Sequence, residues 1–448
     1  EKVYELNLVQ HADKINEITS DAKKQLKIEK SLENIKHIWE EDPSTNLDIA
    51  HVRSKTDDSQ YYRLQNTDKI FEIIEEHTAE LSNMKSSPFY SKFDDKIDLW
   101  ENTIGQITET IELLWQVQGK WQYLENIFMG QPDIAGQLPG ENSTFKQVNK
   151  EFKNHMTRVN KERNAYRALV QSQKDFIKVL AGLNKQLENI QKQLNQFLET
   201  KRGAFPRFYF LSNDDLLEII GQAREPGPIN KHIKKIFEGI YELGYDENGK
   251  GNNKTYTITQ LKSSDEEIIE LPSTPKPVPV DQRVEGWLGK LIKAMQEALR
   301  RGFYRFNNES AQFLKKMGEA DKMWNAIQRS VGQILITSSQ MQWTLDVEGA
   351  LRNMDNSTQG ANSIKKIRTI YRKKIDTYIE IITKRPKMHR KERKKIETLV
   401  IIDEHNREVI EKINALKVTS VNNFEWQQQL RFKKSSHSEE STEALFIQ

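Results

Sequence analysis

Hydrophobic positions recur along most of this chain at the alternating three- and four-residue spacing of a single helix face. The longest unbroken stripe predicts a helix over about 168–200, and its members are Phe176, Leu180, Leu183, Leu187, Ile190, Leu194 and Phe197. Similar spacing predicts further helices over 1–40, 68–81, 90–118, 143–159, 216–222, 229–243, 284–302, 321–344, 364–382 and 396–416. Paired stripes of this length suit antiparallel helices packed along their lengths. The pattern therefore predicts a mainly α fold built from antiparallel helical bundles.

Two short segments alternate between polar and apolar residues and predict strands instead. They cover 255–259 and 266–271, so we expect a small inserted β-hairpin. Residues 49–64 are also expected to be extended. The proline-rich run 272–279 predicts a stiff connector.

Between the longest stripe and the next predicted helix lies a short stretch rich in aromatic residues. Gly203 is expected to let the chain leave the helix, and Pro206 disfavours helical geometry at the residue before it. Ser212 or Asn213 can then cap a new helix that has two aspartates in its first turn. The residues expected to form a rigid joint are Gly203, Phe205, Pro206, Arg207, Phe208, Tyr209 and Phe210. An ordinary buried loop is the alternative.

Large aromatic side chains recur at positions where they can hold neighbouring helices together, since each ring buries on the order of 150–250 Å². The predicted anchors between helices are Trp115, Trp121, Tyr123, Trp287, Trp343 and Trp426. Their simplest interpretation is core packing.

Charge is nearly balanced along the chain, with 68 lysines and arginines against 65 aspartates and glutamates and a formal net charge of +3. A nucleic-acid-binding protein normally concentrates its basic residues on one face. The dense basic cluster at 384–395 is expected to be a solvated loop and helix start, and docking of an acidic partner is the alternative. The absence of cysteine excludes disulfides and thiolate chemistry. Since no run of about 18 apolar residues occurs, no membrane span is predicted.

Signatures of catalytic or metal sites are missing from the sequence. The stretch 244–251 stops one residue short of a phosphate-binding loop, because Gly251 stands where a hydroxyl would hold Mg²⁺. A β-hairpin is the expected structure there. The nine histidines lack the spacing that places two metal ligands on one helix face. We therefore expect no catalytic, cofactor-binding or metal-binding residue in this chain.

Several runs of residues carry a resemblance to a known family. The aromatic run 205–217, with the segments 187–192 and 198–202 before it, closely resembles the linker of dynein heavy chains. The paired-tryptophan region 114–141 and the segments 284–288, 340–343 and 424–432 are similar to the same family. The last of these looks like the junction before the first AAA+ module, with a closer likeness to axonemal members. The resemblance covers roughly residues 85–432.

This resemblance implies an elongated array of helical bundles that lies across a ring of AAA+ modules and bends at an internal hinge. Straightening of such a linker would convert ATP hydrolysis elsewhere in the heavy chain into microtubule-based movement. ATP and magnesium would be bound by the AAA+ modules, so the segment itself is not expected to be an enzyme. A static helical scaffold without a motor role is the alternative function.

The implied partners are the AAA+ ring modules of the same heavy chain, intermediate and light chains bound through the tail, and microtubules indirectly. Neither nucleic acid nor membrane is an expected partner. The implied location is the cytoskeleton of a ciliary or flagellar axoneme, and otherwise the cytoplasm.

The breaks and the resemblance together divide the chain into five expected segments. These are tail-side helices (1–84), first linker bundles (85–202), a central segment with the aromatic joint, short helices and hairpin (203–280), a C-terminal bundle leading to the first AAA+ module (281–432) and a polar, loop-like tail (433–448). The hairpin is expected to be an exposed docking knob for the ring. Because the chain opens without methionine, we also expect it to be part of a larger protein.

Overall fold

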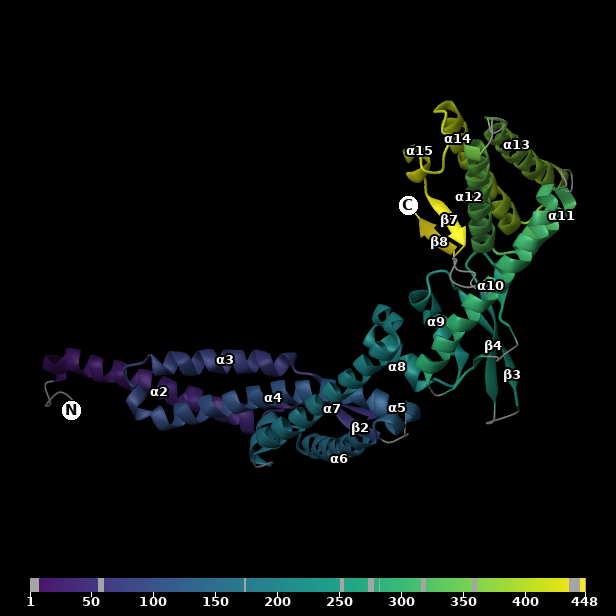
Figure 1. Ribbon diagram of the computed structural model, residues 1–448. Coiled ribbons are helices and arrows are strands. Elements are labelled where there is room, and N and C mark those ends of the chain that lie inside the picture. Colours follow the sequence, from purple (N-terminus) through teal and green to yellow (C-terminus); the bar gives the residue numbers. More distant parts are fainter. Residues whose placement is uncertain are drawn as a thin grey trace. The chain divides into compact units, whose positions relative to one another are not determined.

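The computed structural model describes residues 8–54, 60–172, 175–249, 254–272, 278–281, 283–315, 320–356, 361–434 and 444–447. Contacts within the chain divide it into two compact units, Glu1–Gly203 and Ala204–Gln448. Both units are mainly helical and contain small antiparallel β elements (Figure 1). The predicted fold class, mainly α with a small antiparallel β insertion, is confirmed. The five expected segments stay a prediction.

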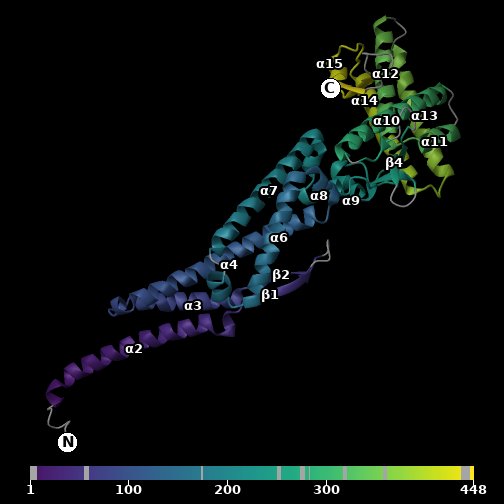
Figure 2. The same ribbon diagram turned by 90° about the horizontal axis from the view of Figure 1, so that it is seen from below.

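The first unit is organised around one long helix, α4. Its helices are α2 (Ala12–Glu40), α3 (Asp68–Lys85), α4 (Asp94–Phe128), α5 (Pro132–Gln137), α6 (Pro139–Glu162) and α7 (Phe176–Ala204), with single turns η1 (Leu8–His11), η2 (Pro43–Thr45), η3 (Tyr90–Lys92) and η4 (Arg167–Gln171). Figure 2 shows α3 running along α4. The two strands β1 (Asp48–Arg53) and β2 (Gln60–Asn66) pair antiparallel, which confirms the extended structure expected there.

Burial in the first unit follows the predicted stripes closely in α7 and only in part in α2. The α7 seam is buried from Phe176 to Leu194, and Leu198 continues it in place of Phe197. In α2 burial begins at Ile28, whereas Ile15 and Ile18 are exposed. The predicted helix over 1–40 is therefore confirmed from residue 12, but its N-terminal half does not pack into the core. Residues 1–7 lie outside the described part of the chain.

Two stretches of the first unit are helical although glycine or proline would suggest a break. The helix expected to end at 118 continues to Phe128, since Gly119 sits on the exposed side while the opposite face stays buried. The run 132–141, rich in proline and glycine, forms α5 and the start of α6. Pro132 and Pro139 occupy first positions of α5 and α6, where a missing N–H costs no hydrogen bond. The helix predicted over 68–81 begins at Asp68, as expected, and Thr67 holds the N-cap position without a side-chain capping bond.

The second unit combines short helices, a sheet and a helical bundle. Its elements are η5 (Pro206–Phe210), α8 (Asn213–Gly221), α9 (Pro226–Ile236), β3 (Glu242–Asn248), β4 (Thr255–Lys262), β5 (Ile268–Glu270), β6 (Val278–Pro279), α10 (Val284–Lys315), α11 (Ala320–Arg329), α12 (Gly332–Asn356), α13 (Ala361–Lys384), α14 (Arg390–Ala415), α15 (Phe424–Gln427), β7 (Arg431–Lys434) and β8 (Ala444–Ile447). The sheet order is β3-β4-β5, with β6 also paired to β4 and all pairs antiparallel. The predicted hairpin β4–β5 is thus present within a larger sheet.

The helices α12, α13 and α14 pack side by side as the core of the bundle (Figure 1). One apolar cluster joins Trp343 and Leu351 of α12 to Tyr371 of α13 and Ile410 of α14. A second cluster adds Ile327 of α11. The antiparallel packing predicted from the paired stripes over 364–382 and 396–416 is confirmed.

Other boundaries in the second unit were predicted wrongly. The helix expected over 229–243 ends at Ile236, because residues 242–248 pair with β4. The helix expected over 321–344 is broken after Arg329 and restarts at Gly332, while α10 continues past 302 to Lys315. Residues 278–279 of the expected connector form β6, and 273–277 lie outside the described residues. The tail expected to be loop-like contains the β7–β8 pair.

Candidate functional site

The candidate site is the aromatic corner, residues 203–210, together with the contacts that hold it. Gly203 lies inside α7, so the expectation that it releases the chain from the helix is wrong. The helix ends at Ala204, and the next residue, Phe205, is extended with a φ of −138° and a ψ of 92°. A following proline favours this geometry, and Pro206 begins η5, as expected.

Half of the corner is firmly packed within the second unit. The rings of Phe205 and Phe208 are buried, with centroids 4.9 Å apart in an edge-to-face arrangement. The Arg207 Nη1 atom donates a hydrogen bond of 3.1 Å to the carbonyl oxygen of Ile236. The same guanidinium lies 4.8 Å from the ring centre of Phe237. These contacts fix the corner to the C-terminal end of α9.

The other half of the corner faces outward. Tyr209 is 61% exposed and Phe210 is 72% exposed, so neither ring belongs to the core of the second unit. In the sequence, the division between the two units falls between Gly203 and Ala204, at the start of the corner.

The helix after the corner begins with a reciprocal cap. Ser212 accepts a hydrogen bond from the backbone N–H of Asp215 at 3.1 Å, and the Asp215 carboxylate accepts one from the N–H of Ser212. Lys235 of α9 donates to the same carboxylate at 2.6 Å, and His232 lies 3.3 Å from it. The hydrogen bond from Lys235, followed by those from Ser212, lowers the pKa of Asp215 despite its partial burial. Of the two candidate caps, Ser212 and Asn213, the structure uses Ser212.

The predicted aromatic anchors of the first unit all lie on α4. Trp121 is fully buried, its Nε1 donates to Oδ1 of Asn149 at 3.0 Å, and its ring centre is 4.8 Å from that of Phe152. Trp115 is half-buried and donates to Oγ1 of Thr67 at 3.1 Å. Tyr123 is half-buried as well. Both tryptophans therefore link α4 to neighbouring elements.

The anchors of the second unit are buried more uniformly. Trp287 on α10 and Trp426 on α15 are fully buried, and Trp343 on α12 is nearly so. The ring centres of Trp343 and Trp426 lie 5.2 Å apart, so the short helix α15 is held against the bundle.

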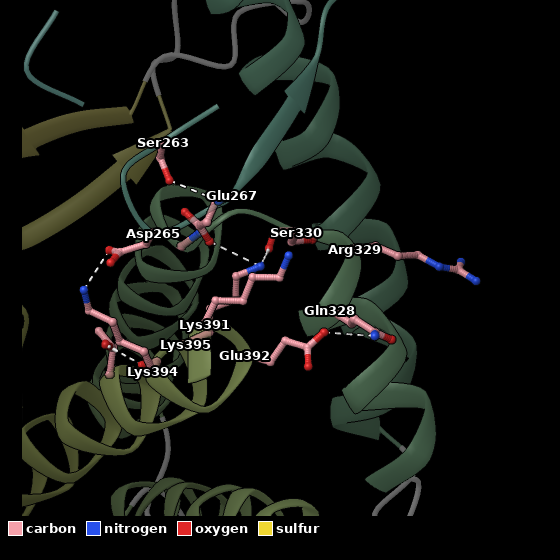
Figure 3. Close-up of polar contacts among 12 residues, drawn as sticks. Ser263, Asp265, Glu267, Gln328, Arg329, Ser330, Lys391, Glu392, Lys394 and Lys395 are labelled. Atoms are coloured by element: carbon pink, nitrogen blue, oxygen red, sulfur yellow. Dashed lines mark hydrogen bonds and ion pairs between the residues drawn. The ribbon is translucent and has the colours of Figure 1, made fainter. Parts of the chain in front are cut away.

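A second set of polar contacts, the sheet latch, joins the turn between β4 and β5 to the helical bundle (Figure 3). The Glu267 carboxylate accepts a hydrogen bond of 2.9 Å from the N–H of Gly332, the first residue of α12. It also lies 3.2 Å from Nζ of Lys395, which donates to the carbonyl oxygen of Ser330 at 2.6 Å. Glu266 adopts a φ of 63°, uncommon for a residue with a side chain, directly before Glu267. The carboxylate thus covers the break between α11 and α12.

The latch changes the interpretation of two sequence features. Lys395 is almost buried and Lys394 forms an ion pair of 2.7 Å with Asp265. Arg385 pairs with Asp321 and stacks 5.1 Å from the ring centre of Trp324. The basic cluster does contain a helix end and a helix start, but much of its charge is used within the unit. Glu267 and Lys395 hold the hairpin turn to the bundle, although residues 264–266 are exposed, so docking of the hairpin on the ring stays a prediction.

One buried polar group was not predicted from the sequence. Asp403 of α14 is fully buried and accepts hydrogen bonds from Oγ of Ser339 at 2.7 Å and from the hydroxyl of Tyr378 at 3.0 Å. Its Oδ2 atom also lies 2.8 Å from Nζ of Lys374. Burial, and then the charge of Asp403, raise the pKa of Tyr378 well above its usual range. The sequence does carry a signal for this group, because Asp403 lies between Leu399 and Val409 at a position of the apolar stripe where a hydrophobic residue would be expected.

The part of the chain that the structure describes contains no recognisable chemical site. Within it, no group of three or more histidine, aspartate and glutamate residues could hold a metal ion. Helices in that part are too short or too polar to cross a membrane. Residues 244–248 of the near-match to a phosphate loop form strand β3 and do not precede a helix, whereas 250–253 lie outside the described residues.

Comparison with known proteins gives a match that includes the aromatic corner. The family described as "Dynein heavy chain, N-terminal region 2" matches residues 1–305. This chain belongs to the dynein heavy chain family. The resemblance seen in the sequence is thereby confirmed, and both the corner and the sheet lie inside the matched region.

Individual dynein heavy chains match over nearly the whole chain. "Dynein axonemal heavy chain 2" of Mus musculus is 39% identical over 432 residues, which are 96% of this chain. "Dynein-1-beta heavy chain, flagellar inner arm I1 complex" of Chlamydomonas reinhardtii is 35% identical over 427 residues, 95% of this chain. "Cytoplasmic dynein 2 heavy chain 1" of Homo sapiens is 32% identical over 366 residues, 80% of this chain. The chain spans 8–9% of the length of these dynein relatives.

Proposed function

We propose that this segment is the mechanical linker of a dynein heavy chain, a lever that bends and straightens as ATP is hydrolysed elsewhere in the same polypeptide. The observation that carries the proposal is the family match over residues 1–305, which includes the corner where the chain divides into two units. A lever needs stiff arms and a localised joint whose two states are biased by outside contacts.

Stiffness in each arm has a physical source in the structure. In the first unit the buried seam of α7 continues without a break from Phe176 to Leu198. In the second unit the sheet latch ties the sheet to α12 and α14 through Glu267 and Lys395. Continuous packing and buried polar contacts resist bending within a unit, so strain would concentrate between units.

The joint is assigned to the aromatic corner, and its exposed rings provide the test. A Tyr209→Ala/Phe210→Ala variant in a whole motor removes side chains that the second unit does not need for its core. ATP turnover by this variant should stay within about twofold of the rate of the unmodified motor, whereas its microtubule gliding velocity should fall severalfold. Ile401→Ala removes a similarly exposed side chain (70%) on α14 and should leave both rates unchanged.

Phe208 gives a second variant, because it is buried and holds the corner to α9. Phe208→Ala should also uncouple turnover from gliding, with some loss of stability typical of a buried aromatic. Normal gliding by both variants in a folded motor would exclude the corner as the joint and favour a static scaffold.

The partners and cofactors follow from the same proposal. The ring of AAA+ modules in the heavy chain would bind ATP and magnesium and contact this segment. Intermediate and light chains would join through the tail, and microtubules would be moved indirectly. The purified segment should not hydrolyse ATP on its own. An ATPase activity that stays in constant ratio to the segment through purification would contradict the assignment.

The location proposed for the motor is a ciliary or flagellar axoneme. The support is that the mouse relative at 39% identity is named an axonemal heavy chain. Fluorescent tagging of the full-length protein tests this, and uniform cytoplasmic fluorescence in ciliated cells would contradict it.

Contact with the ring through the sheet is proposed for the β3–β4 side, since the β4–β5 turn is held by the latch. Tyr245 of β3 is partly exposed and its ring packs edge-on against Tyr256 of β4, with centroids 5.5 Å apart. Tyr245→Ala in a whole motor should lower microtubule-stimulated ATPase activity, and unchanged stimulation would count against this contact.

A further inference from the structure

Helices α3 and α4 of the first unit enclose an open groove of about 750 Å³. Its floor is apolar, formed by the buried side chains of Ile74, Leu81 and Ile104. Gly105 leaves the middle of the groove open, because a Cβ atom added there would meet nothing within 4 Å. The groove runs along two antiparallel helices, so its shape suits a third helix packed beside them.

The walls of this acidic groove carry four glutamates and neither lysine nor arginine. Glu101 pairs with Lys85. Glu75 on α3 and Glu109 and Glu112 on α4 make no hydrogen bond or ion pair within the described residues. Unpaired carboxylates therefore stand on both sides of an apolar floor.

Helix α2 contacts α3 at another position. Trp39 of α2 donates a hydrogen bond of 2.9 Å to Nδ1 of His77, which is buried on α3. Thr78, the next residue, lines the groove. Successive helix residues point about 100° apart, so Thr78 and the groove opening lie on a different side of α3 from the contact between His77 and Trp39. That contact therefore does not fill the groove.

We propose that this groove binds an amphipathic α-helix of a partner protein that carries lysine or arginine on both flanks of its apolar stripe. The apolar stripe would pack over the exposed Thr78, Ala79 and Gly105, which lie above that buried floor, in the helix-in-groove manner of recognition. The flanking cations would pair with Glu75 on one side and with Glu109 and Glu112 on the other. Charge complementarity of this kind raises specificity and the association rate.

Two synthetic helical peptides with the same leucine stripe, one flanked by lysines and one by glutamates, test the proposal. Fluorescence anisotropy with the 448-residue chain should give at least tenfold tighter binding for the lysine peptide. Raising the salt concentration from 50 to 500 mM should weaken that binding severalfold, because the rim pairs are exposed. Equal affinity for both peptides would overturn the proposal.

Matched variants of the chain locate the binding. Gly105→Phe fills the groove and should weaken binding at least tenfold, whereas Gly119→Phe, at an exposed and open position of the same helix, should not. Glu109→Gln/Glu112→Gln should also weaken binding, and Glu29→Gln/Glu33→Gln on α2 removes the same charge as a control. Circular dichroism checks that each variant is folded.

Two outcomes would overturn the assignment. Binding that survives both Gly105→Phe and Glu109→Gln/Glu112→Gln would place the peptide elsewhere. Self-association of the chain that Gly105→Phe abolishes would identify a second copy, and not a basic partner helix, as the occupant.

Discussion

Single polar side chains determine features of the second unit that its apolar stripes do not. Asp403 occupies a core position of α14 and is satisfied by Ser339, Tyr378 and Lys374. A buried ion pair adds little net stability compared with an apolar pair of similar size. Loss of one partner is costly, however, because the other charge is left buried and unpaired.

Lys374→Met should therefore lower the free energy of unfolding by about 3–5 kcal/mol. The double variant Lys374→Met/Asp403→Leu should be less destabilised than Lys374→Met, because it leaves no unpaired charge. Urea denaturation followed by circular dichroism measures both. Lys384→Met, which breaks the exposed pair with Glu380, is the control and should leave the free energy of unfolding almost unchanged. A double variant less stable than either single one would refute this account.

Asp215 predicts a pH dependence of the second unit. Its folded-state pKa is lowered, chiefly by the hydrogen bond from Lys235, so its contribution is complete above the unfolded pKa of about 4. That contribution is lost as pH falls through the folded pKa. Asp215→Asn should remove about 0.5–1 kcal/mol of the stability lost on acidification from pH 5 to pH 3. Calorimetry across this range tests it, with Asp214→Asn in the same helical turn as control.

At the scale of elements, tertiary contacts decide where helices and strands stop. The helix pattern over 321–344 is continuous, yet the structure breaks it where Glu267 binds the N–H of Gly332. Residues 242–243 continue a helical pattern but pair with β4. In both places a partner distant in sequence supplies hydrogen bonds that a continued helix would have made internally.

The latch makes a prediction about local stability. Glu267→Gln removes the charge that faces Lys395, so the β4–β5 turn and the start of α12 should open more often. Amide hydrogen exchange at 268–270 and at Gly332 should speed up about tenfold or more. Asp265→Asn removes the exposed pair with Lys394, each partner being more than half exposed, and should change exchange less than threefold. Equal effects of the two variants would show that the latch is not the stabilising contact.

At the scale of the molecule, the division into two units predicts separable folding. Each unit has its own fully buried large side chains, such as Trp121 in the first and Trp287 in the second. Fragments 8–204 and 205–447 should each unfold cooperatively in urea, and their circular dichroism spectra should add to that of the whole chain. A fragment that is unfolded alone would show that its core depends on the other unit.

Much of this molecule was determined by the sequence itself. The period of the apolar residues specified the helices and their packed faces, because burial of a stripe is a local geometric consequence of 3.6 residues per turn. Pro206 and Ser212 marked the end of one helix and the start of the next through backbone geometry and capping, which are also local. The family resemblance rested on the same short-range runs.

Only the tertiary structure decided which of the corner's rings are buried, where the sheet is fastened and which carboxylates remain unpaired. Phe208 and Phe210 are equivalent in composition, but only Phe208 finds a pocket within its unit. Glu267 and Glu109 are both ordinary glutamates in the sequence, and one is held by Gly332 and Lys395 whereas the other lines an open groove. These differences arise because burial and pairing depend on residues brought close by the fold, which the spacing along a single segment does not encode.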